Sequence, residues 1–391
     1  MQPKYSLIRR PALRWSATLL LSAGACFKPQ SSAQSEVRFT LVAAGDVAHP
    51  QNTEHASEFK MLAERMFKPT RFISRSADLA FVSLASAITT RMPTSPNKIT
   101  FTSAPATLDG LVSSGFNIIN VGHNHVMDAG KPGLKDTLDL LAAHRQKLPP
   151  TKMLIWGGAG LTAEEVRRVA FFEVSGKGVR GAFLSYGNIQ SPHVNLFRPK
   201  IAAAEIAGLR RSGAVDFILV SVRWGREYTH FPGEKVIAEL RSLIDAGADV
   251  VLAHQAHVPQ GIEYYRGKPI FYSLGNYLMG TVTRRNGKAK LYGYIPKMHF
   301  AQRDGKIHAE KIEIFATYND NRQPMYVGKT KLPYRRFVTE VVKNPFAEVI
   351  LTAITQWSRQ LPGNAALFQL QGEKLEILPP PDKSDRQQGA Q

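Results

Sequence analysis

Nine short apolar runs recur between residues 37 and 274, and each has the length of one β-strand. They cover residues 37–44, 78–84, 116–121, 152–156, 169–174, 180–186, 215–222, 249–253 and 270–274. Several are continuously apolar instead of alternating, which is typical of strands that are covered on both faces. The pattern therefore predicts a body whose strands lie inside the molecule.

Helical periodicity appears between these runs. Residues 133–145 place Leu134, Leu138 and Leu141 on one helical face. Residues 234–246 also place apolar side chains on one face, and the glycine that follows them, Gly247, is a natural helix end. The alternation of the two patterns predicts the α/β class, with helices packed on a mixed or parallel sheet.

The pattern changes after residue 280. Residues 284–343 hold fourteen Lys and Arg against five Asp and Glu, and short runs at 290–295 and 306–315 predict antiparallel strands, with a helix at about 345–360. We expect five segments: a signal peptide or lipoprotein signal (1–33), a main domain (34–280), a basic antiparallel extension (281–345), a C-terminal helix and strand (346–378) and a disordered tail (379–391).

The N-terminus has the pattern of a secretory signal. Basic residues, including Arg9 and Arg10, precede a short apolar run and then small residues. Three interpretations stay open: cleavage near Ala33, lipid attachment at Cys26, or a signal anchor that stays uncut. Each predicts an exported protein, periplasmic or at the cell surface.

Composition narrows the classes of protein. The 391 residues are 43% hydrophobic and 21% charged, which is globular usage and excludes a wholly disordered chain. A net charge of +19 favours polyanionic partners, although no arrangement typical of nucleic-acid binding accompanies it. The single cysteine excludes a disulfide framework and a cysteine zinc site.

Polar clusters follow four of the apolar runs. They contain Asp46, then His123 to His125, then Arg223 to Glu227, then His254 to His257. The carboxyl ends of strands line the ligand crevice in open α/β sheets, so we expect one convergent site. Carboxylate, amide and imidazole ligands without thiolate suit zinc, manganese or iron(II).

The order of these motifs resembles a known family. Gly45-Asp46-Val47, the stretch from Asn124 to Gly130, Arg223-Trp224-Gly225, the stretch from His254 to His257 and the stretch from Gly267 to Tyr277 are similar to motifs of the CapA-type capsule and poly-γ-glutamate biosynthesis family. Its domain is similar to the calcineurin-like metallophosphoesterases. The resemblance covers roughly residues 38–280 and implies a metallophosphoesterase-like layered sandwich of mixed sheets flanked by helices.

Three departures from the family pattern affect the predicted site. Ser86 stands where the family usually has a glutamate, and Arg223 replaces the histidine of a His-Trp-Gly motif. An arginine cannot bind a metal, so these changes favour one ion over two. His123 adds an imidazole that the family pattern lacks.

The resemblance, together with these departures from it, suggests a role for each candidate residue, and the planar guanidinium of Arg223 suits an anion. Asp46, Asn124, His254 and His257 would bind one divalent metal (Mn, Zn or Fe). His125 and His123 would act in catalysis, His125 as the acid, and Arg223 would clamp an anionic group. The supporting residues would be Glu227, Asp128 and Asn276.

Two functions remain open at this point, and with them the question whether the chain is an enzyme. The first is an exported metal-dependent hydrolase or transferase acting on an anionic cell-surface polymer or phosphoester. The second is a non-catalytic envelope protein that binds or anchors an acidic polymer through its basic surface, with a degraded metal site. Both predict an acidic polymer such as poly-γ-glutamate or capsule as partner, and membrane-bound synthesis proteins beside it.

Overall fold

A computed structural model describes residues 36–48, 65–94, 100–279, 291–320, 324–327, 330–335 and 338–380. The expected signal (1–33) and Cys26 lie outside these residues, as does most of the expected tail. No helix in the described part of the chain is long and apolar enough to cross a membrane.

The larger sheet has ten strands and carries the first half of the site. Its order is β19 (Leu367–Gln371), β20 (Lys374–Leu378), β15 (Lys306–Asp320), β14 (Tyr292–Arg303), β1 (Val37–Ala48), β2 (Leu79–Leu84), β5 (Ile118–Asn120) and β6 (Ile155–Gly157). Two further strands join it, β13 (Asn276–Met279) beside β1 and β18 (Val338–Val341) beside β15. The strands from β1 to β6 are parallel, and β14, β15, β20 and β19 continue antiparallel.

The smaller sheet has six strands and carries the second half of the site. Its order is β11 (Ile262–Tyr265), β12 (Lys268–Phe271), β10 (Val250–His254), β9 (Phe217–Arg223), β8 (Val179–Tyr186) and β7 (Ala170–Val174). Its central strands are parallel, and β7 and β11 run antiparallel at its edges. Two short pairs complete the strands: β3 (Ala87–Ile88) with β4 (Thr102–Ser103), and β16 (Pro324–Val327) with β17 (Thr330–Arg335).

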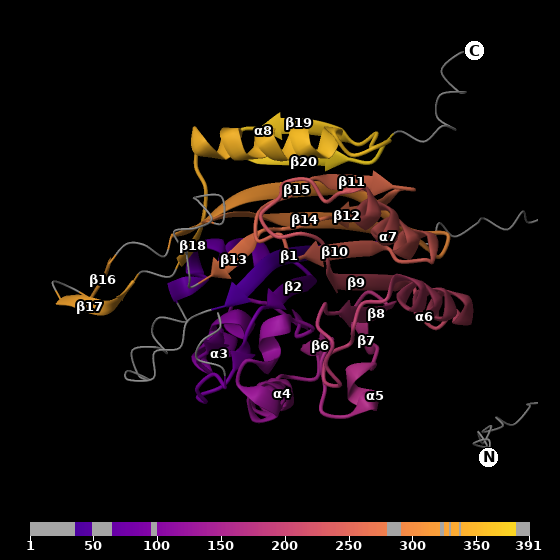
Figure 1. The fold of residues 1–391 in the computed structure, drawn as a ribbon. Helices are drawn as coiled ribbons and strands as arrows, with labels where there is room; N and C mark the ends of the chain where they lie inside the picture. Colours follow the sequence, from indigo (N-terminus) through magenta and orange to yellow (C-terminus); the bar gives the residue numbers. More distant parts are fainter. Residues whose placement is uncertain are drawn as a thin grey trace, which may run out of the picture. The chain divides into compact units, whose positions relative to one another are not determined.

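The two sheets face each other across one apolar core. Phe39 and Phe81 of the larger sheet meet Phe183 and Phe217 of the smaller one there. A second core lies under α3 (Ala106–Ser113) and α4 (Gly130–Lys147), and a third under α6 (Pro199–Ser212) and α7 (Glu234–Asp245). Figure 1 shows these helix pairs on different sides of the strands. The expected layered sandwich of mixed sheets flanked by helices is confirmed.

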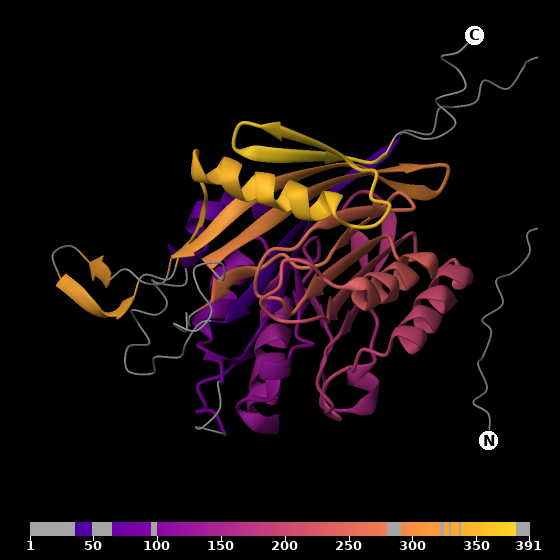
Figure 2. The ribbon, with the colours of Figure 1, turned by 45° about the horizontal axis from the view of Figure 1, so that its top comes forward.

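The C-terminal segment packs against the apolar core between the two sheets. Helix α8 (Phe346–Arg359) buries Leu351 and Ile354 against β15 and β20, and Figure 2 shows it lying across these long strands. The remaining helices are short: α2 (Arg71–Ser74), α5 (Ala163–Val166) and two 3-10 turns, η1 (Lys68–Thr70) and η2 (Asn124–Met127). The segment boundaries expected from the sequence remain predictions, and β14 pairs directly with β1 across the expected boundary at 280.

Candidate functional site

The carboxyl ends of four strands bring the central residues together. Asp46 lies near the end of β1, Arg223 and His254 are the last residues of β9 and β10, and His123 follows β5. All four are buried, with at most 2% of their surface exposed. The strand-end pattern of the sequence therefore located a real cluster, formed by both sheets.

Gly45 explains how Asp46 enters this cluster. The register of β1 against β2 shifts between Ala44 and Asp46, and a Cβ at Gly45 would lie 2.0 Å from the carbonyl oxygen of Gly275. Only glycine allows the backbone before β13 to approach this closely. The Asp46 amide donates to that same carbonyl at 3.3 Å, which fixes the carboxylate at the strand end.

Arg223 occupies the centre of the cluster. Its Nη1 donates to Asp46 Oδ2 at 3.0 Å, and its Nη2 lies 3.2 Å from His257 Nε2. A guanidinium only donates, so His257 Nε2 accepts and the ring is neutral, with its proton on Nδ1. That nitrogen lies 2.9 Å from Asn276 Oδ1 and donates to it.

The surroundings keep the carboxylate charged and the imidazoles neutral. Burial by itself would raise the pKa of Asp46, but the cation of Arg223 holds that pKa well below its usual value. Burial lowers the pKa of His254 to about 4, opposed by Asp46 and reinforced by Arg223. Burial and then Arg223 lower the pKa values of His123 and His257 in the same direction.

The other predicted residues lie nearer the surface, around this centre. His125 Nδ1 lies 2.7 Å from Asp128 Oδ2, which also accepts the backbone amide of Phe101 at 2.6 Å. The ring of His125 stacks on that of His123, with centroids 5.4 Å apart. The exposed Glu227 accepts from Gln255 Nε2 at 3.1 Å. The structure thus gives Glu227 a glutamine as its partner.

Sequence analysis missed Gln255, Tyr228 and Asn188. Gln255 links two loops, since it accepts from Asn188 at 2.9 Å and donates to Glu227. Gln255, Tyr228 and His257 all have a positive φ, of 127°, 61° and 57°. Such strain in non-glycine residues clusters at functional sites. No sequence signal marks it, because none of the three is a glycine or asparagine.

The metal expected from the sequence can be tested against these contacts. Among the described residues, no three or more His, Cys, Asp or Glu side chains form a group that could hold an ion. Arg223 takes one oxygen of Asp46 and one nitrogen of His257, two of the four predicted ligands. The hydroxyl of Ser86 pairs with that of Ser103 at 2.7 Å. A guanidinium and a divalent cation repel each other and compete for the same carboxylate, so with Arg223 in this place the residues do not fit the ion.

Some buried polar atoms nevertheless have no partner. Asp46 Oδ1, Asn124 Oδ1, His123 Nε2 and His254 Nε2 make no hydrogen bond within the described structure. His254 Nδ1 lies 3.7 Å from Asp46 Oδ1, beyond hydrogen-bond range. Orphaned buried atoms of this kind need water or an ion. The far side of the carboxylate is therefore polar and unsatisfied.

Comparison with known proteins adds a family match. Residues 40–281 match the family model described as "Bacterial capsule synthesis protein PGA_cap". The chain is 26% identical over 338 residues to a PGA biosynthesis protein CapA of Bacillus subtilis, covering 82% of each. It is 28% identical over 199 residues to a capsule biosynthesis protein CapA of Bacillus anthracis, covering 48% of this chain but only 46% of that protein.

A third relative and a solved structure extend the comparison. A probable polyglutamine synthesis accessory protein of Mycobacterium tuberculosis is 28% identical over 226 residues, covering 51% of this chain and 55% of that protein. A 5'-nucleotidase structure from Candida albicans aligns with a TM-score of 0.37 and 12% identity, covering 66% of this chain and 47% of that chain.

Proposed function

The chain belongs to the family of bacterial capsule synthesis proteins, and we propose that it is an exported accessory protein that binds an acidic polymer of the poly-γ-glutamate type. The observation that carries this proposal is the contact of Arg223 with Asp46 and His257. It places a fixed protein cation beside the carboxylate that the hydrolase hypothesis needs for a metal.

The charge of the whole chain supports an acidic partner. The sequence carries 50 Lys and Arg against 31 Asp and Glu. Such an excess raises the local concentration of polyanions and speeds their association. A relative named for PGA biosynthesis makes a polymer of carboxylates the first choice of ligand.

Binding to poly-γ-glutamate tests this function. We expect the purified protein to bind a labelled poly-γ-glutamate oligomer at about 20 mM salt and to lose most of that affinity at about 500 mM, because salt screens exposed charges. Fluorescence anisotropy measures both. Lack of binding at low salt, or binding that is indifferent to salt, would contradict the proposal.

One observation favours the metal-dependent hydrolase or transferase as a second candidate. The unpartnered Asp46 Oδ1, Asn124 Oδ1 and His254 Nε2 are the ligand types that a divalent ion prefers. This candidate requires an ion to bind beside Arg223 without displacing it. Metal content therefore separates it from the first candidate.

A further inference from the structure

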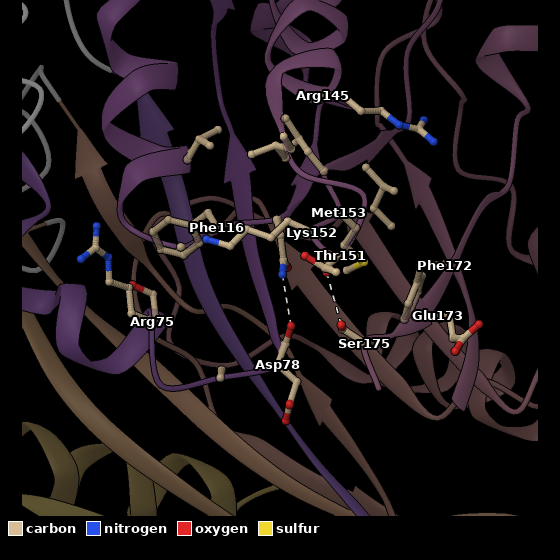
Figure 3. Close-up of a pocket in the computed structure, with 18 of the residues that line it drawn as sticks. Arg75, Asp78, Phe116, Arg145, Thr151, Lys152, Met153, Phe172, Glu173 and Ser175 are labelled. Carbon is tan, nitrogen blue, oxygen red and sulfur yellow. Dashed lines mark hydrogen bonds between the residues drawn. The ribbon is translucent and has the colours of Figure 1, made fainter. Parts of the chain in front are cut away.

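A groove opens at the edge of the larger sheet opposite the candidate site. It runs past the residues that precede β2, β5 and β6, whereas Asp46 and His123 lie at the other ends of these strands. Its volume is about 1130 Å³. The end of β7 and the turn after it form one wall of the groove, as Figure 3 shows with Glu173 and Ser175.

The groove carries uncompensated positive charge. Arg75, Arg145 and Lys152 line it and are exposed, and Figure 3 shows the two arginines on opposite sides with Lys152 between them. Within the described structure, Arg75 donates only to the Ser113 carbonyl, a neutral acceptor, and no carboxylate contacts the other two cations.

The acidic residues of the groove do not cancel this charge. Asp78 is occupied elsewhere, because it accepts from Thr40 at 2.7 Å and forms an ion pair with Lys177 at 3.1 Å. Glu173 alone remains to oppose the three cations. The groove therefore has a surplus of two positive charges.

Two apolar side chains with exposed surface also line the groove. They are Phe171, which is 58% exposed, and the half-buried Met153, which Figure 3 shows beside Lys152. A chain of carboxylates separated by short methylene segments matches both features. Its carboxylates would meet the cations, and its methylene groups would cover the apolar residues.

We propose that this groove is the binding site for a poly-γ-glutamate chain, a position separate from the cluster around Arg223. The inference rests on the proposed function, because it assumes that the protein binds such a polymer. It extends that function by naming the part of the protein surface on which the polymer would lie. Arg145 and Lys152 would each pair with a carboxylate of the polymer.

Paired charge reversals test the location. The groove variant is Arg145→Glu with Lys152→Glu, and the control is Lys200→Glu with Arg211→Glu on α6, outside the groove. The two variants change the net charge equally. All four residues are exposed, and Arg145 and Arg211 both lie in the last turn of a helix, so these two substitutions have a similar cost to the helix dipole. Lys200 lies in the first turn of α6, where a glutamate does not destabilise the helix.

At low salt we expect the groove variant to bind the labelled poly-γ-glutamate oligomer about tenfold or more weakly than the parent does, and the control to bind it within about threefold of the parent. The reason is that a cation in direct contact with a polymer carboxylate contributes more to binding than a distant cation contributes through the overall electrostatic field. Equal losses in both variants, or no loss in the groove variant, would overturn the location and leave the proposed function standing. A parent protein that does not bind would overturn both. If the glutamate variant unfolds, Arg145→Gln with Lys152→Gln, against Lys200→Gln with Arg211→Gln, gives the same comparison.

Discussion

At the scale of single residues, the buried pair of Asp46 and Arg223 decides what the site can do. Both side chains are nearly inaccessible, and the cation lies 3.0 Å from the carboxylate. Removing one member of such a pair leaves a buried charge without a partner, whereas removing both members leaves no buried charge.

Unfolding free energies of variants measure this coupling. We expect Arg223→Met alone to lower stability by about 3–5 kcal/mol, and Asp46→Asn with Arg223→Met together to cost less than the sum of the two single changes. The exposed pair of Lys135 and Asp139 is the control, where Lys135→Met should cost under about 1 kcal/mol. Additive losses at the buried pair would show that the two charges do not depend on each other.

The buried histidines predict how stability depends on pH. The pKa of His254 is lowered from 6.5 to about 4 in the folded state. Below pH 6.5 the imidazole is therefore protonated in the unfolded chain but stays neutral in the folded protein, down to about pH 4. Stability is therefore full above pH 6.5 and falls toward pH 4. His254→Gln should reduce this slope by about 1.4 kcal/mol per pH unit. Urea unfolding between pH 7.5 and about 4.5 measures it, and an unchanged slope would contradict the buried neutral state.

Residue types alone could predict part of this centre. Asp46, His123 and His254 follow apolar runs directly, and the carboxyl ends of strands did bring them together. The partners of Arg223 could not be predicted, because the sequence does not show whether a long side chain points inward or toward solvent. The role of anion clamp expected for Arg223 stays a prediction, and the structure shows its guanidinium buried against Asp46 and His257.

At the scale of elements, close backbone contacts hold the C-terminal helix in place. A Cβ at Gly261 would lie 2.9 Å from the backbone of Trp357 in α8, and Ser358 Oγ accepts the amide of Ile262 at 2.9 Å. The ring of His230 stacks on Trp357, with centroids 4.0 Å apart. Through these contacts α8 supports the loop that carries Glu227 and Tyr228.

A glycine substitution tests this attachment. We expect Gly261→Ala to lower the free energy of unfolding by about 1–3 kcal/mol, because the added methyl group meets backbone that cannot move freely. Gly208→Ala is the matched control: nothing lies within 4 Å of its Cβ position in α6, so it should stabilise by about 0.5–1 kcal/mol. Chemical denaturation distinguishes them, and equal stability of the two variants would show that α8 is not packed as described.

Hydrophobic periodicity predicted which helices and strands exist better than it predicted the residues at which they begin and end. The helix expected at 234–246 is Glu234–Asp245, and the one expected at 133–145 extends to Gly130–Lys147. The strand expected at 152–156 is only Ile155–Gly157, since its first residues precede the sheet and line the groove. The helix Pro199–Ser212 was not predicted, because its three buried or half-buried alanines give a weak apolar stripe.

At the scale of the whole molecule, the alternation of apolar runs and helical periodicity predicted the α/β class, because continuous apolar runs require cover on both faces. The family resemblance implied the layered sandwich. The sequence did not show that β14, β15, β20 and β19 extend the same sheet as β1. That extension depends on long-range pairing, which local patterns do not contain. Family membership and the excess of basic residues act at this scale too, and together they support an acidic polymer as the partner.

The measurement that tests the central claim most directly is metal content. The parent protein, Arg223→His and His254→Ala would each be incubated with Mn²⁺ or Zn²⁺, dialysed and measured by elemental analysis. If Arg223 takes the place of the ion, the parent retains no more metal than His254→Ala, and Arg223→His gains about one equivalent because imidazole is a ligand and guanidinium is not. About one equivalent in the parent, lost in His254→Ala, would contradict the account and favour the metal-dependent enzyme.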